Sequence, residues 1–255
     1  MSKSAEHATA TRNASVRQPA KRSTLARLVL AALPVIALFV LWHVVVRQGV
    51  YTHEDTLGRQ DLYAGNFRGA QDHFDRMVHL DPSAYLGYWN RASSEGALNR
   101  TREAMADCTR TLQILATPAG ARQVRDGRGH PGAQIRRVRA ALHAQRGGLE
   151  EAAGMPQEAI QDYAACVENM PEWDYPLFRL TQLELTTGLY KKARLDANTL
   201  ASRRPLAPQP YLLRAQAAAA LGDHDGAEED RRRADGLTQM EHGVLPLSDQ
   251  MPQDR

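Results

Sequence analysis

Histidine flanked by carboxylates is the pattern in this chain most able to do chemistry, because such sets bind metal ions or transfer protons. It occurs twice, as Asp72-His73 with Asp75 and as Asp223-His224-Asp225. Adjacent residues of a helix point in different directions, so neither set converges on one ion or one substrate atom if it lies on a helix or its turn. We therefore expect no metal site and no acid–base site at either place.

The two cysteines are the remaining candidates for reactive groups. Cys108 and Cys166 lie at core-type positions of helical segments and do not form a CxxC pair. Each is most simply a small buried apolar residue, although a disulfide between them stays open in an oxidising compartment. The sequence contains no phosphate-binding glycine loop, nucleophile elbow or zinc-type cysteine spacing. We expect no catalytic residues, no metal and no cofactor, and hence a protein that is not an enzyme.

A 34-residue period organises most of the chain. Its units begin near Tyr51, Tyr85, Ala140, Asp174 and Pro208, in steps of 34, 55, 34 and 34 residues. Alanine recurs in every unit, and glycine or asparagine stands five residues before it: Gly65/Ala70, Asn99/Ala104, Gly154/Ala159, Gly188/Ala193 and Gly222/Ala227. Glycine and asparagine tolerate the left-handed conformation that ends a helix, and alanine lets two helices approach closely. Pro82, Pro171 and Pro205 then stop the second helix of three units.

This pattern resembles the tetratricopeptide repeat family over residues 51 to 238. The resemblance implies an all-α fold in which about five helix-turn-helix units, at 51–84, 85–116, 140–173, 174–207 and 208–238, stack into an α-solenoid. It also implies protein or peptide partners rather than a small-molecule substrate. The chain departs from the family in lacking a first-helix tryptophan at the family's usual position. An aromatic residue of the family is replaced by Asp61, Glu95, Glu150, Glu184 and Ala218.

In this family the first helices line a concave groove. The corresponding groove residues here are Trp89, Ser93, Tyr175, Phe178, Gln182, Leu212 and Gln216. Clustered aromatic and apolar side chains commonly anchor protein partners, but the same rings could instead pack between helices, and both interpretations stay open. One subset of the family grips a partner's carboxyl terminus with Lys, Asn and Arg. Of the corresponding residues here, Asp55, Arg59, Asn90, Ala141 and Gln145, only Asn90 fits, so we expect no such clamp.

The long step between the second and third units holds 21 extra residues. Residues 117–132 are turn-rich and predict an exposed loop. Helical spacing resumes at Ile135 and Val138, which predicts that the third unit's first helix starts about two turns early. Basic residues gather here: Arg122, Arg125, Arg128, Arg136 and Arg137. Such a loop suits anionic lipid headgroups or an acidic partner, and an idle solvated loop is the alternative.

Residues 28–46, LVLAALPVIALFVLWHVVV, are apolar except for Pro34 and His43. A helix of this length spans about 29 Å, close to the hydrocarbon thickness of a bilayer, and predicts one transmembrane helix. A cleaved signal peptide is less consistent with the sequence, because its apolar stretch would be shorter and would end in small residues. Thr52 with Asp55 predicts a capping box where the first helix of the array begins.

Charge is distributed unevenly along the chain. The formal net charge is +3, but residues 1–27 carry six basic residues against Glu6. The positive-inside tendency places this basic tail in the cytosol, and the basic excess is no argument for nucleic acid. Arginine and alanine are abundant, which suggests a GC-rich bacterium. These observations predict a single-pass inner-membrane protein with a cytoplasmic N-terminus and a periplasmic array. A mitochondrial targeting sequence is an alternative, and residues 239–255 read as a disordered tail.

These inferences together predict a membrane-anchored scaffold that binds other proteins and aids the assembly or maturation of an envelope complex. Two alternatives remain open at this point: a structural homo-oligomer, and a non-catalytic platform subunit of an envelope enzyme. A fold of this kind supports binding but does not select the partner.

Overall fold

The computed structural model describes residues 21–124 and 131–239, and every regular element in these two ranges is an α-helix. The helices are α1 (Lys21–Tyr63), α2 (Phe67–Leu80), α3 (Tyr85–Ala97), α4 (Thr101–Ala116), α5 (Pro118–Gln123), α6 (Pro131–Ala152), α7 (Pro156–Asn169), α8 (Asp174–Thr186), α9 (Tyr190–Arg203), α10 (Pro208–Ala220) and α11 (His224–Gln239). The all-α prediction is confirmed. Of the tail predicted at 239–255, Gln239 is instead the last residue of α11, and residues 240–255 lie outside the described residues, as do residues 1–20 of the basic tail, Arg125 and Arg128.

The chain divides between Val50 and Tyr51 into two parts. The described portion of the first part is the N-terminal stretch of α1, and Pro34 lies inside this helix. Large apolar side chains from Val29 to Val50 are 41 to 70% exposed. One stretch of α1 is long and apolar enough to cross a membrane, as judged by its length and composition. Exposing a row of Val, Leu and Phe side chains to water is unfavourable in free energy, so an apolar environment around this stretch of α1 would stabilise it.

The start of the first array helix differs from the prediction. Thr52 and Asp55 form no capping box, because α1 passes through them without a break. Thr52 is instead an interior helix residue whose carbonyl oxygen accepts a hydrogen bond from Thr56 Oγ1 at 2.9 Å. The residues before it, VVVRQGVY, contain no proline, and their single glycine does not end the helix. Without a breaker, the apolar helix and the first array helix become one element.

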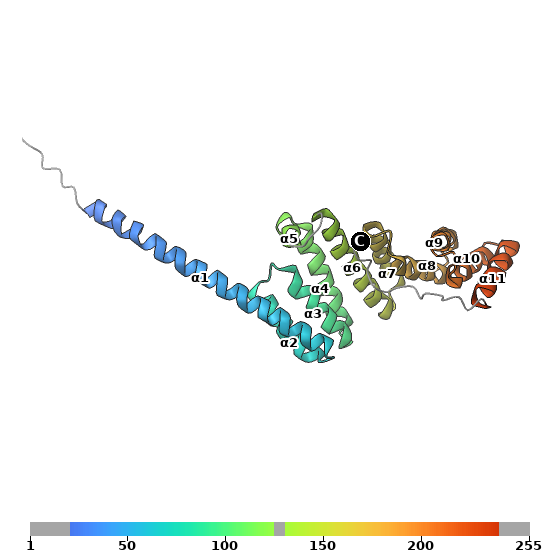
Figure 1. Ribbon diagram of the computed structural model, residues 1–255, viewed down its shortest axis with the longest axis horizontal. Helices are drawn as coiled ribbons and strands as arrows, with labels where there is room; N and C mark the ends of the chain where they lie inside the picture. Colours follow the sequence, from blue (N-terminus) through green and yellow to red (C-terminus); the bar gives the residue numbers. More distant parts are fainter. Residues whose placement is uncertain (1–20, 125–130, 240–255) are drawn as a thin grey trace, which may run out of the picture. The chain divides into compact units, whose positions relative to one another are not determined.

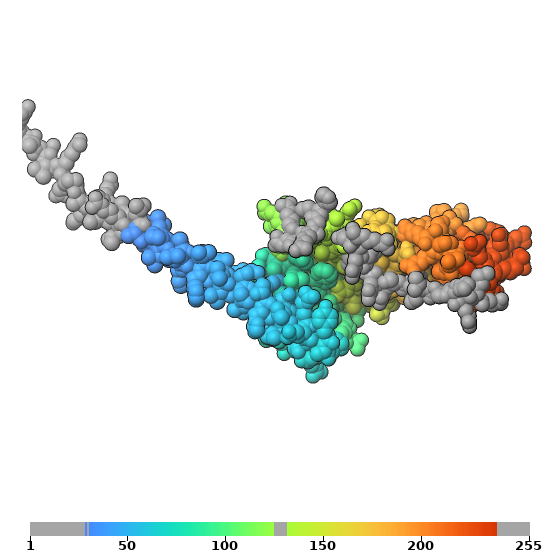
Figure 2. Space-filling model, in the orientation of Figure 1, coloured from blue at the N-terminus to red at the C-terminus, as the bar shows by residue number. Residues whose placement is uncertain are grey.

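The second part is an array of five helix pairs (Figure 1). Unit one consists of α1 from Tyr51 onward and α2; units two to five are α3/α4, α6/α7, α8/α9 and α10/α11. Helices of one unit pack on each other, and each unit then packs on the next, as in α2 against α3 and α7 against α8. Figure 2 shows the colours of the array following one another in chain order along its surface. The contacts between helices are mainly between sequence neighbours.

The turn inside each unit has the same construction. Gly65, Asn99, Gly154, Gly188 and Gly222 all have positive φ, between 60 and 83°. The residue after each of them closes the turn by donating its N–H to the carbonyl oxygen of the residue five positions earlier, as Asn66 does to Asp61 at 2.9 Å. These contacts satisfy carbonyl groups that the end of a helix leaves open. The alanine five positions after each of these positive-φ residues is 0% exposed in all five units.

The insertion between units two and three is partly helical. The predicted loop at 117–132 contains α5, which Thr117 caps by accepting a hydrogen bond from Gly120 N–H at 3.0 Å. Gln123 fixes the far end of α5, because its side chain accepts from Tyr85 N–H at 3.1 Å and donates to the Ser83 carbonyl at 3.0 Å. After residues 125–130, α6 begins at Pro131, nine positions before Ala140, in agreement with the predicted early start.

The core runs through the array as a series of apolar clusters. One of them joins units three, four and five: Ala159, Ile160, Tyr163, Leu177, Leu180, Leu183, Ala197, Leu200 and Leu213. Another joins Tyr51 of α1 to Phe74 and Met77 of α2, with Leu86 of α3 packed against them. Each unit therefore buries its apolar faces against its own second helix and against its neighbours, and none forms a closed core alone.

Candidate functional site

Seven side chains were assigned to the groove, and all of them lie on first helices. Trp89 and Ser93 are on α3, Tyr175, Phe178 and Gln182 are on α8, and Leu212 and Gln216 are on α10. Trp89, Phe178 and Leu212 are the fifth residues of their units, and Ser93, Gln182 and Gln216 are the ninth. Because positions five and nine are one helical turn apart, these residues form two rows across the first helices. In α6 the rows contain only Ala144 and Gly148.

Trp89 connects units two and three. Its indole N–H donates to Gln145 Oε1 at 3.0 Å, and Gln145 Nε2 donates in turn to Ser93 Oγ at 3.2 Å. The ring also packs against the buried cluster around Leu115 and Leu142. Trp89 is half-buried rather than fully exposed, so it supports the interface between two units and leaves part of the ring on the surface.

The aromatic residues of α8 are also half-buried. Tyr175 lies 6.4 Å from buried Trp173, ring centre to ring centre, and Phe178 packs against the cluster of units three to five. Gln182 is held by Arg179, which donates to its Oε1 at 2.8 Å and forms an ion pair with Glu151 of α6. These contacts fix the rotamers of the row before any partner arrives, which lowers the entropic cost of binding.

Unit five presents the most open part of the two rows. Leu212 is 40% exposed and Gln216 is exposed on the same face of α10. The rows therefore change from half-buried rings in units two and four to a solvent-facing leucine and glutamine in unit five. A partner's apolar side chain would meet Leu212 without displacing any internal contact.

The positions of the carboxylate clamp are used internally. Asn90 Nδ2 donates to Asp55 Oδ1 at 2.7 Å, so two of these side chains bind each other across α3 and α1. Gln145 is occupied by Trp89 and Ser93. The remaining basic position, Arg59, is exposed on α1.

The fold of this chain is similar to those of several solved structures. The chain matches the crystal structure of MamA protein with 14% identity and a TM-score of 0.61, covering 77% of this chain and 98% of that chain. It matches MamA 41-end from Desulfovibrio magneticus RS-1 with 10% identity and a TM-score of 0.60, covering 76% and 98%. It also matches YrrB, described as a TPR protein with an unusual peptide-binding site, with 14% identity and a TM-score of 0.57, covering 72% and 84%.

The chain has a tetratricopeptide repeat fold. The family resemblance seen in the residues is thereby confirmed at the level of the fold. No protein-family model and no curated protein matches the sequence. Similarity at this level of identity shows the fold alone, and any function has to be argued from the residues.

The basic residues of the insertion are only partly described. Arg122 is exposed on α5, and Arg136 is exposed on α6, whereas Arg137 is half-buried. The neighbouring Arg139 is structural, because its Nη2 donates to the Leu115 carbonyl at 3.0 Å. Arg125 and Arg128 lie outside the described residues. The tetratricopeptide repeat array therefore presents at least two of the five predicted basic side chains to solvent.

Sequence reasoning missed a second surface on the second-helix side of the array. A cleft of about 780 Å³ lies between α9, α10 and α11, lined on α9 by Lys191, Arg194, Leu195 and Asn198. Leu195 is 68% exposed, and the equivalent residues of the other units are Asp72, Ala106, Gln161 and Glu229. An exposed leucine at a position that is elsewhere polar or small was the available signal, and it becomes visible only when the units are compared with one another.

The reactive-group candidates have structural explanations in the tetratricopeptide repeat frame. His73 Nδ1 lies 2.6 Å from Glu54 Oε2, and Asp223 accepts the Gly226 N–H at 3.0 Å to cap α11. Cys108 and Cys166 are both free and fully buried. Burial raises the pKa of each thiol to about 12, so neither forms the thiolate that nucleophilic chemistry needs near neutral pH.

A buried ion pair recurs at fixed spacing inside the units, and sequence reasoning did not identify it. Arg91 binds Asp107 with two hydrogen bonds of 2.6 and 2.9 Å. Arg146 binds Asp162 in the same way, and so does Arg214 with Asp230, always 16 residues apart. Each pair joins the first helix of a unit to its second. Unit four lacks the arginine, because Leu180 takes its place opposite Asp196.

Proposed function

We propose that this chain is a membrane-anchored scaffold whose first-helix rows bind a segment of another protein, as an extended peptide or as a helix. The array would face the periplasm of a bacterium and assist the assembly or maturation of an envelope complex. The observation that carries the proposal is the row of Trp89, Phe178 and Leu212 at the same position of the first helices α3, α8 and α10, with Gln182 and Gln216 beside it. Half-buried rings give apolar anchors, and the amides give hydrogen bonds to a peptide backbone.

The fold supports this proposal in general terms. A solenoid exposes one continuous face of its first helices, which suits a partner segment longer than a single side chain. YrrB, one of the similar structures, is described as having a peptide-binding site. The location of any site on the present chain rests on its own residues.

The anchor is supported by α1. Its exposed apolar side chains, from Val29 onward, would each gain free energy on leaving water, at about 25 cal/mol per Å² of apolar surface. Extraction of membranes with alkaline carbonate tests the anchor, because an integral protein stays in the membrane fraction. A reporter enzyme fused after Arg255 tests topology, and activity in the cytosol would reverse the proposed orientation.

The groove is tested by placing a photo-crosslinking amino acid at Gln216 in intact cells and identifying the adducts by mass spectrometry. Leu212→Glu should then abolish the adduct, because it puts a charge where a partner's apolar side chain would dock. Leu195→Glu is the matched control, since it charges an exposed leucine on the other side of the array. Adducts that survive Leu212→Glu would contradict the groove, and adducts made only with a second copy of the chain would favour the homo-oligomer.

A further inference from the structure

Units two, three and four each bury a glutamate at the eleventh position. Glu95, Glu150 and Glu184 are 5%, 7% and 0% exposed. Each lies in the last turn of a first helix, where its own carbonyl oxygen accepts the hydrogen bond that closes the turn. At least one side-chain oxygen of every one of them has no hydrogen-bond partner. A carboxylate buried in this way is costly unless it is neutralised.

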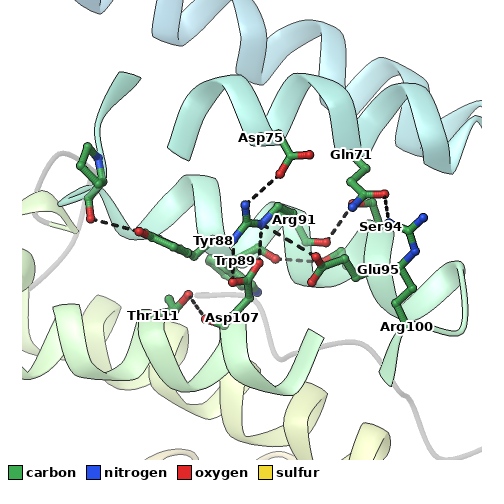
Figure 3. Close-up of polar contacts among 12 residues, drawn as sticks. Gln71, Asp75, Tyr88, Trp89, Arg91, Ser94, Glu95, Arg100, Asp107 and Thr111 are labelled. Carbon is green, nitrogen blue, oxygen red and sulfur yellow. Dashed lines mark hydrogen bonds and ion pairs between the residues drawn. The ribbon is translucent and has the colours of Figure 1, made fainter. Parts of the chain in front are cut away.

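In unit two, Glu95 competes with two other carboxylates for one arginine. Arg91 gives its two short hydrogen bonds to Asp107 of α4 and a third, at 2.8 Å, to Asp75 of α2 (Figure 3). Glu95 is left at 3.9 Å from the guanidinium. Glu103 of α4 adds a further negative charge nearby. With every carboxyl ionised, one cation would face an excess of negative charge.

Unit three repeats this arrangement. Arg146 is fully engaged by Asp162 of α7 and by Thr109 of α4, and Glu150 remains 3.6 Å from it. His143 of α6 lies 3.0 Å from Asp162, and Glu158 of α7 faces Glu150 as a further negative charge. The hydrogen bonds from Arg146 and His143 outweigh burial and hold the pKa of Asp162 below its ordinary value. Glu150 is therefore the member of this pair that takes up a proton first as the pH falls.

Unit four has the same carboxyl pair without the guanidinium. Glu184 of α8 faces Asp196 of α9, and Leu180 stands where units two, three and five have arginine. The nearest cation is the exposed Lys192, whose Nζ lies 3.3 Å from Glu184 Oε1. Neither oxygen of Glu184 has a hydrogen bond as a carboxylate, but a protonated Glu184 can donate to Asp196.

The pKa values of all three glutamates shift in the same direction. Burial, reinforced by the neighbouring aspartate, raises the pKa of Glu95, Glu150 and Glu184 to about 7. Unit five is the internal comparison, because Ala218 replaces the glutamate there and Arg214 with Asp230 is a balanced pair.

We propose that the glutamates of units two to four form a proton-dependent latch between the first and second helices of each unit. With its proton, the glutamate is a neutral group that fits the buried interface. Without it, two carboxylates face each other across the helix pair, and the interface must open toward water to hydrate them. Unit four has Leu180 in place of the arginine that faces the carboxyl pair and loosens first, whereas unit five keeps its packing.

The direction of the pH dependence follows from the shift. The folded array binds these protons up to about pH 7, whereas an unfolded glutamate loses its proton near 4.5. The contribution to stability is therefore complete below about pH 4.5 and is lost as the pH rises through 7. Unfolding at about pH 6 should release roughly two to three protons from these groups.

The test compares the full chain in detergent micelles with the triple variant Glu95→Gln, Glu150→Gln, Glu184→Gln. The wild-type melting temperature should fall by roughly 10–20 °C between about pH 5.5 and pH 7.5 through these groups, and the variant should lose that part of the slope. The control is Glu168→Gln, Glu172→Gln, Glu228→Gln, which makes the same charge change at exposed sites and should keep the slope. Equal slopes in all three proteins, or equal proton release on unfolding near pH 6, would overturn the latch.

Leu180→Arg tests the latch without removing a glutamate. It supplies the missing cation of unit four in the geometry that units two, three and five already use, and a folded variant is judged by its unchanged helical circular dichroism. Hydrogen exchange should show α8 and α9 losing protection above about pH 7 in the wild type, after correction for the intrinsic rate, and keeping it in the variant. Equal loss in both proteins, or first loss in α10 and α11, would contradict the proposal.

Discussion

Arg146 donates to two helices besides its own, and it thereby links units two and three. It binds Asp162 of α7 with two hydrogen bonds and Thr109 of α4 with one at 2.9 Å. Its guanidinium is the only counter-charge within 4 Å of Glu150 among the ion pairs of the described residues. Removing the charge would leave Asp162 buried with His143 as its remaining side-chain partner.

Arg146→Met should accordingly destabilise the array by about 3–5 kcal/mol, since it breaks a buried pair and keeps only the apolar stem. Arg76→Met is the comparison, because Arg76 is half-exposed and pairs with Glu54 near the surface; its loss should cost less than about 1 kcal/mol. Thermal unfolding followed by circular dichroism at neutral pH measures both. Equal losses of stability in the two variants would show that the buried pair contributes no more than the surface pair.

The two thiols should be inert in the folded protein. Cys108 and Cys166 are 0% exposed, and burial raises the pKa of each to about 12, so neither solvent access nor thiolate is available. Iodoacetamide at about pH 8 should leave both unmodified in the native chain and alkylate both in guanidinium. Rapid native labelling, detected by mass spectrometry, would show that α4 or α7 opens locally.

At the scale of the elements, the backbone strain at the turn residue between two helices can be measured separately from side-chain packing. Gly222 and Gly236 both have open space where a Cβ would stand, but Gly222 has φ of +83° and Gly236 lies inside α11. Gly222→Ala should therefore cost about 1 kcal/mol through backbone strain, whereas Gly236→Ala should be neutral or stabilising by up to about 1 kcal/mol. Chemical denaturation of the two variants checks the difference. A loss at both sites would refute the assignment of strain to φ.

The elements that could be predicted from the sequence are those with local signals. Gly154 and Ala159 have a fixed local role, and so the turn and the close helix approach were visible in a single unit. The continuity of α1 was not predictable from a capping box, because a box can form only where a helix starts, and Thr52 has no breaker before it. The position of α5 depends on Gln123 reaching Tyr85, a contact between residues 38 positions apart, which no local pattern reveals.

The candidate site also combines features that a local pattern predicts with features that depend on tertiary contacts. The rows containing Trp89 and Phe178 were predicted from the period together with the family resemblance, but the burial of half of each ring depends on contacts with other helices. The Arg-Asp pairs were also encoded at a constant spacing of 16 residues, and Glu95 was noticed as a departure from the family. The effect of Glu95 depends on Asp107, which faces it from the second helix. This is a tertiary contact.

At the scale of the array, each unit contacts mainly its neighbours, so damage should remain local. Ala227 of α11 is 0% exposed, and Ala227→Met should overpack unit five by about 1–3 kcal/mol. Hydrogen exchange should rise in α10 and α11 and stay unchanged in α2 to α4. Ala220→Met, at the exposed end of α10, is the control and should change neither region. A uniform rise along the array would instead indicate one cooperative unit.

The placement of the three tryptophans gives the molecule its own optical probes. Trp42 is 69% exposed on the apolar stretch of α1, Trp89 bonds Gln145 at the junction of units two and three, and Trp173 is 6% exposed between units three and four. Their emission maxima should differ accordingly, with that of Trp42 responding to lipid and that of Trp173 shifting to the red when α8 separates from α7. Variants that keep one indole each would therefore report insertion and repeat opening by fluorescence, without an added dye.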